Sequence, residues 1–129
     1  MGFFNRLLGG NNENNDSNID WAALNDVAQI DEIVQESKKQ TVAIFKHSTR
    51  CGISRMVLSG FERDYDYNGE EIKMYFLDIL NFRNISNEIA NRFNVWHESP
   101  QLLVFRDGKI IYHTSHGNIE AGKLNEFIK

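Results

Sequence analysis

The residue whose type and position are best suited to chemistry is Cys51, the one cysteine in a chain of 129 residues. It follows the apolar run 41–45 and precedes a stretch with helical spacing, so it stands at or just before a predicted helix N-terminus. Unpaired backbone N–H groups and the helix dipole favour an anion there, and the thiolate is the reactive form of cysteine. Arg50 can add a positive charge beside it. These features predict a nucleophilic thiol rather than a packing residue.

The spacing Cys51-Gly-Ile-Ser54 matches a C-x-x-C redox motif with serine in the second place. Serine cannot resolve a mixed disulfide as a second cysteine would, so Cys51 has to act alone. The Ser54 hydroxyl could donate a hydrogen bond to the Cys51 thiolate, or it could serve only the first helical turn. The sequence leaves both readings open.

Alternating strand and helix patterns must position this motif. The runs 19–24, 41–45 and 73–79 predict three strands, each followed by a helix, and Asp26 is the predicted N-cap of the first helix. The apolar stripes of these helices consist of Val27, Ile30, Ile33 and Val34, then Ile53, Met56, Val57, Phe61 and Tyr65, then Phe82, Ile85, Ile89 and Phe93.

The second half of the chain predicts a hairpin and a closing helix. The strands 101–105 and 110–113 flank Asp107-Gly108, a strong turn signal because a tight primed turn needs positive φ. The last helix is expected over 119–129, with Asn118 as its cap. The order β-α-β-α-β-α-β-β-α predicts an α/β protein of thioredoxin-like fold, with a mixed central sheet flanked by helices.

In this fold a cis-proline stands before the hairpin and faces the reactive cysteine, and Pro100, the only proline, occupies that place. The backbone of Ser99 is then expected to pair with an extended substrate. His97 can line the same groove, and Gly117 precedes the last helix, where backbone groups could hold carboxylates of a small thiol. Trp96 is either a substrate contact or a packing residue.

Three stretches resemble the monothiol bacilliredoxin family: His47-Ser-Thr-Arg-Cys-Gly-Ile-Ser54, Val95-Trp-His-Glu-Ser-Pro-Gln101, and Asp107-Gly-Lys109 with Tyr112-His-Thr-Ser-His-Gly117. The likeness runs from about Trp21 to the C-terminus. It implies a protein that removes bacillithiol from cysteines of oxidised proteins, with Cys51 as the active cysteine and Pro100 as the cis-proline. Gly52 departs from the proline expected in many members, and the resulting Cys-Gly-Ile-Ser is close to the Cys-Gly-Phe-Ser of monothiol glutaredoxins.

The resemblance implies no tightly bound cofactor, a low-molecular-weight thiol (bacillithiol or another) as co-substrate, and S-thiolated client proteins as partners. Two alternatives remain open. The first is an iron–sulfur carrier, in which Cys51 of two chains and two small thiols hold a cluster. The second is a non-enzymatic interaction module of the same fold. No metal site is expected within the chain, since His113 and His116 lack clear further ligands nearby.

Composition and charge limit the possible partners and the cellular compartment of the protein. A net charge of −4 without a visible basic face argues against nucleic acid as a partner. A single cysteine is typical of a reducing compartment, most simply the cytoplasm. The first ten residues are too short and polar for a signal peptide or membrane span. Because residues 9–18 are rich in glycine and asparagine, we expect a flexible segment over 1–18 and one domain over 19–129.

Overall fold

Strand β2 (Thr41–His47) lies at the centre of the molecule, and all seven of its residues are buried. In the computed structural model, which describes residues 19–128, β2 pairs in parallel with β3 (Ile72–Asp78) and antiparallel with β4 (Gln101–Arg106). Strand β1 (Ala22–Ala23) extends the sheet beyond β3, and β5 (Lys109–Ser115) extends it beyond β4. The resulting order β1-β3-β2-β4-β5 is the mixed sheet that the sequence predicts.

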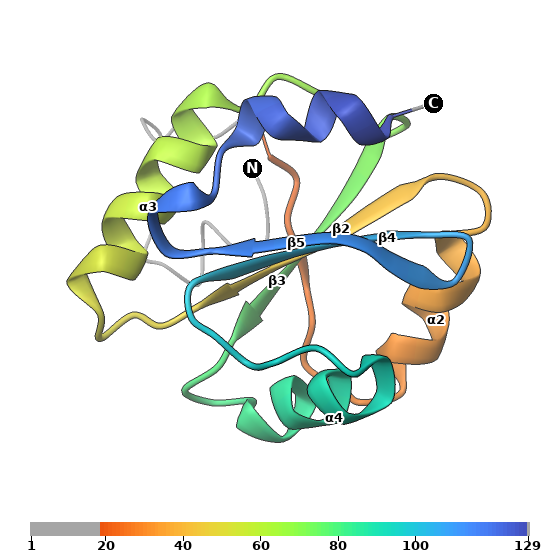
Figure 1. The fold of residues 1–129 in the computed structure, drawn as a ribbon, viewed down its shortest axis with the longest axis horizontal. Helices are drawn as coiled ribbons and strands as arrows, with labels where there is room; N and C mark the ends of the chain where they lie inside the picture. Colours follow the sequence, from red (N-terminus) through yellow and green to blue (C-terminus); the bar gives the residue numbers. More distant parts are fainter. Residues whose placement is uncertain (1–18, 129) are drawn as a thin grey trace.

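Helices cover both faces of this sheet (Figure 1). Helix α3 (Gly52–Asp64) and the 3₁₀ helix η2 (Ala121–Phe127) cover one face, and α2 (Gln29–Glu36) and α4 (Arg83–Phe93) cover the other. Because side chains alternate along a strand, odd-numbered apolar residues of β2 join the core under α3 and even-numbered ones join the core under α2 and α4. This double coverage explains why β2 reads as a continuous apolar run.

The closing segment differs from the expected α-helix over 119–129. The chain instead forms two 3₁₀ helices, η1 (His116–Asn118) and η2, and Glu120 rather than Asn118 precedes η2. The buried residues of η2 are Ala121 and Leu124, a spacing of three that matches three residues per turn. Gly122 also weakens α-helical propensity in this stretch. The first strand is likewise shorter than predicted, with two residues instead of six.

Helix α3 presents part of the predicted stripe to the core, since Phe61 and Tyr65 are buried and Val57 packs against them. Its buried residues are Ser54, Leu58 and Phe61, whereas Ile53 and Met56 are 55% and 70% exposed. The buried set follows i, i+4, i+7 spacing, so one face of the helix explains it. The prediction was wrong for Ile53 and Met56, and it did not include Leu58 or the small Ser54, which is fully buried.

The hairpin between β4 and β5 is confirmed. Asp107 and Gly108 have φ values of 54° and 81°, both in the left-handed region that a primed turn needs. The turn is attached to the end of α2, because the Asp107 N–H donates to the Ser37 carbonyl at 2.7 Å and the Gly108 N–H donates to Ser37 Oγ at 2.8 Å.

We predict that Gly108→Ala lowers the free energy of unfolding by about 1–2 kcal/mol, because a Cβ is strained at positive φ. Gly69→Ala is the matched control, since its φ is not positive and an added Cβ there meets no atom within 4 Å. Urea denaturation of both variants measures the difference. Equal stabilities would contradict the assigned turn geometry.

Candidate functional site

Cys51 occupies the N-cap position of α3, in extended conformation with φ −103° and ψ 120°. Its carbonyl accepts from the Arg55 N–H at 3.1 Å, and its own N–H donates to the Ser48 carbonyl at 3.2 Å. The residue is partly exposed. The first turn of α3 contains no acidic residue. The Cys51 side chain makes no capping hydrogen bond, but its residue lies at the positive end of the helix dipole, in a turn without a carboxylate to oppose an anion.

Ser54 is fully buried and its hydroxyl is engaged away from the thiol. Its Oγ accepts from the Ser48 N–H at 3.1 Å and lies 2.8 Å from His47 Nδ1. Among residues 19–128, no hydrogen bond joins Ser54 to Cys51. The Ser54 hydroxyl therefore connects the end of β2 to the turn that precedes α3.

His47 is buried, and burial is the main reason that its pKa falls to about 4. The charge of Asp78 opposes this decrease and that of Arg55 adds to it. The imidazole is therefore neutral at physiological pH. It pairs with Ser54 on one side and its ring lies 5.4 Å from the ring of Phe76. Through its contact with Ser54, His47 helps to fix the turn that contains Cys51.

The Ser99–Pro100 peptide bond is cis, as predicted. Pro100 directly precedes β4, and Gln101 pairs with Lys46 at the end of β2. The loop from β2 that contains Cys51 and the loop that contains the cis-proline therefore leave neighbouring strands at the same edge of the sheet (Figure 1). The 3₁₀ helix η1 adjoins both, since it contacts α3 and the His116 N–H donates to the Pro100 carbonyl at 3.0 Å.

Gln101, which the sequence analysis did not single out, holds the loop before the cis-proline. Its buried side chain donates through Nε2 to the Trp96 carbonyl at 3.0 Å and accepts at Oε1 from the Glu98 N–H at 3.4 Å. Ser115 Oγ donates to the Glu98 carboxylate, which ties the same loop to the end of β5. The sequence signal that could have identified Gln101 is an amide side chain within a strand predicted to be buried.

The other predicted site residues differ in how far they are buried and in what they contact. His97 is half-buried in the cis-proline loop and hydrogen-bonded to Ser86, so it is not a solvated loop histidine. Arg50 and Gly117 are exposed, and within the described chain Arg50 forms no ion pair or hydrogen bond. Trp96 is 87% exposed and does not pack on the core. Ser99 Oγ is buried and has no hydrogen-bond partner within residues 19–128.

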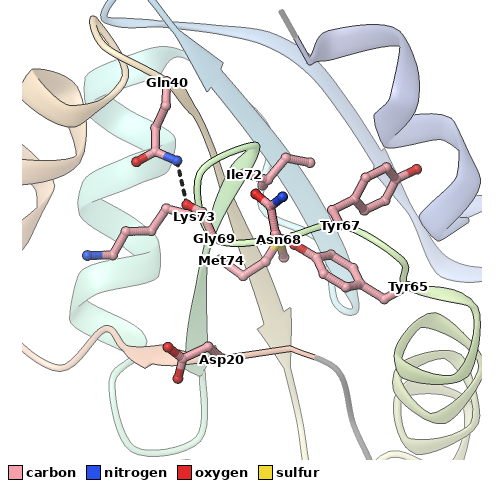
Figure 2. A pocket seen from close by; sticks show the side chains of 9 residues that line it. All are labelled: Asp20, Gln40, Tyr65, Tyr67, Asn68, Gly69, Ile72, Lys73 and Met74. Carbon is pink, nitrogen blue, oxygen red and sulfur yellow. Dashed lines mark hydrogen bonds between the residues drawn. The ribbon is translucent and has the colours of Figure 1, made fainter.

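A cavity of about 380 Å³ lies at the other end of the sheet, where β2 and β3 begin (Figure 2). Asp20, Gln40, Asn68 and Lys73 are among its lining residues, and the Gln40 amide donates to the Gly69 carbonyl at 2.9 Å across it. Because Cys51 follows the end of β2, this cavity is separated from the thiol by the length of the strand.

Over positions 19–128, no group of three or more histidine, cysteine, aspartate or glutamate side chains is arranged to hold a metal ion. Within the same range, no helix has the length and hydropathy needed to span a membrane.

The fold and this edge of the sheet define a protein of the thioredoxin class, and comparison with solved structures agrees. A structure described as a candidate oxidoreductase with a thioredoxin fold superposes with a TM-score of 0.69 and 30% identity, covering 82% of this chain and 91% of that one. Thioredoxin of Malassezia sympodialis gives 0.64 at 19% identity, covering 86% and 88% of the two chains. Thioredoxin of Trypanosoma brucei brucei gives 0.61 at 19%, covering 90% and 92%.

The family model described as monothiol bacilliredoxin BrxC matches residues 22–124. The chain belongs to this monothiol bacilliredoxin family, and its single cysteine fits a monothiol protein.

We predict that His47 makes stability depend on pH. Its pKa is lower in the folded state than the ordinary 6.5, so the unfolded chain binds more protons between pH 6.5 and 4. The contribution is fully present above pH 6.5 and is lost as the pH falls toward 4. The loss over this range amounts to about 3 kcal/mol.

His47→Gln should flatten the dependence of unfolding free energy on pH over this range, measured by urea denaturation. His97, whose pKa is also lowered, leaves a residual slope of the same sign. His113→Gln changes an exposed residue of β5 and should leave the slope unchanged. A His47→Gln slope equal to that of the wild type would contradict the buried neutral imidazole.

Proposed function

We propose that this protein removes a low-molecular-weight thiol from mixed disulfides on client proteins, and that Cys51 is its catalytic residue. From the family we infer that this thiol is bacillithiol. The observation that carries the proposal is the position of Cys51, a partly exposed thiol at the N-cap of α3. We place this activity in a reducing compartment, the cytoplasm, because a monothiol needs a supply of reduced small thiol.

The exchange needs two steps and no cofactor. The Cys51 thiolate attacks the sulfur of the small thiol in the mixed disulfide, and that disulfide bond breaks as a new one forms to Cys51. The client sulfur leaves as a thiolate and takes a proton from solvent. A second molecule of small thiol then attacks the adduct, releasing Cys51 as thiolate and forming the symmetrical disulfide, so the second thiol supplies the electrons.

Features at the cis-proline support a binding role for this loop. Ser99 Oγ is buried without a partner in residues 19–128, and a buried hydroxyl costs free energy unless it is hydrogen-bonded. A bound substrate segment could satisfy it while pairing with the adjacent backbone. We therefore propose Ser99 and Pro100 as substrate-binding residues, with His97 beside them.

The first test mixes reduced protein with a test protein carrying one bacillithiol mixed disulfide and follows intact mass. We expect the adduct to move to Cys51, free bacillithiol to release it, and Cys51→Ser to accept none. Ser59→Ala, on the same helix, is the control that leaves transfer unchanged. Transfer from a glutathione mixed disulfide alone would replace the small thiol but keep the mechanism. Transfer from neither would refute the proposal.

The second test restores a resolving cysteine. Position 54 lies one turn after Cys51 and, as the second cysteine of C-x-x-C, can form an internal disulfide. In the Ser54→Cys variant, the adduct on Cys51 should therefore release the small thiol without added thiol. The protein that remains should be two hydrogen atoms lighter than the reduced variant. Mass spectrometry of the purified adduct follows this reaction. An adduct as long-lived as in the wild type would show that position 54 cannot reach Cys51.

A further inference from the structure

A buried lysine with an unusual environment lies at the end of β2. Lys46 has 0% of its surface exposed. Its Nζ has one partner within residues 19–128, His97 Nδ1 at 3.5 Å, although an ammonium group offers three donors. The Ser86 hydroxyl lies 2.7 Å from the same Nδ1. Lys46, Ser86 and His97 thus bring together β2, the first turn of α4 and the cis-proline loop.

This cluster has positive charge, and no acid within residues 19–128 is salt-bridged to its two cations. Arg83, the first residue of α4, acts electrostatically on both Lys46 and His97. Among residues 19–128, no carboxylate forms a salt bridge with Lys46 or Arg83, and the first turn of α4 contains no acidic residue. Buried charges in proteins are normally paired, and helix N-termini favour anions over cations. The arrangement is therefore one that an incoming anion would stabilise.

The hydrogen bonds also determine how His97 can act. An ammonium on Lys46 can only donate, which favours the tautomer of His97 in which Nδ1 accepts and the ring hydrogen resides on Nε2. Burial is the main reason that the pKa of His97 is lowered, and the charges of Lys46 and Arg83 lower it further while Glu98 opposes them. His97 is thus a neutral hydrogen-bond donor at physiological pH, with an ammonium group behind it.

A small ligand has room to reach this histidine. An open cavity of about 270 Å³ adjoins it, lined by Ala90, Asn91, Asn94, Val95, Trp96 and His97. The amides of Asn91 and Asn94 and the exposed ring of Trp96 suit a polar organic molecule rather than an apolar one.

We infer that Arg83 and His97, backed by Lys46, form a subsite for a carboxylate of the small thiol, whose polar body occupies the adjoining cavity. This inference rests on the proposed function and deepens it, because it makes the protein selective for thiols with a negative charge. It also places the carboxylate beside α4, and not at the Gly117 backbone as the sequence analysis expected. The carboxylate accepts from His97 Nε2, and the positive charges of Arg83 and the Lys46 ammonium strengthen this hydrogen bond.

The test compares two small thiols of similar size on one single-cysteine test protein, 3-mercaptopropionate with a carboxylate and 2-mercaptoethanol without one. The rate of transfer to Cys51 is measured by intact mass for the wild type and Arg83→Gln. We expect Arg83→Gln to slow transfer of the mercaptopropionate by about threefold, as for a partly exposed ion pair, and to leave transfer of mercaptoethanol unchanged. Arg63→Gln, which removes an exposed charge at the other end of α3, should change neither rate.

The outcomes separate the possible sources of the anion. Equal slowing of both thiols by Arg83→Gln would assign the anion to the client protein and overturn the inference, as would no slowing of either. Wild-type protein that accepts neither of these thiols but accepts bacillithiol would overturn the inference, whereas wild-type protein that accepts none of the three would refute the proposed function itself. Lys46→Met supplies a second variant, because an apolar side chain of similar length suits a buried site. It should reproduce the selective loss.

Discussion

The pairing of β2 with β3 on one side and β4 on the other is the constraint on which the rest of the structure depends. All seven residues of β2 are buried, so its register cannot slip without exposing the core. The antiparallel register with β4 places Lys46 opposite Gln101. As a result, Cys51 and the cis-proline, which lie about fifty residues apart in the sequence, emerge at the same edge of the sheet.

Buried polar groups at this edge satisfy one another and hold the loops in place. His47 pairs with Ser54 under the Cys51 turn, and Gln101 holds the backbone of the cis-proline loop. Lys46 and His97 connect that loop to α4 through Ser86. Each of these groups would cost free energy if it were buried alone, so the network favours one arrangement of the loops over others. A reactive thiol benefits because the groups around it are positioned before substrate arrives.

The surface around Cys51 differs in character from the protein as a whole. The chain carries a net charge of −4, yet the first turns of α3 and α4 contain no acidic residue. Exposed apolar side chains, Ile53 and Met56 on α3 and Trp96 before the cis-proline, also come from this edge. Two helix N-termini without acidic residues and a partly apolar surface are consistent with the proposed exchange, in which a thiolate and an anionic small thiol must approach each other.

The sequence by itself determined the order of the elements, the α/β class, the hairpin at Asp107-Gly108 and the cis bond before Pro100, and it pointed to Cys51 as the candidate reactive residue. These features depend on local signals, namely apolar periodicity, turn chemistry and residue types that occur once. Tertiary structure alone decided which face of α3 is buried, that η2 is a 3₁₀ helix, and that Ser54 bonds to His47. It also decided that Lys46, Ser86 and His97 meet. Such contacts join residues far apart in the chain, and their geometry depends on strand register and helix docking, which no local pattern encodes.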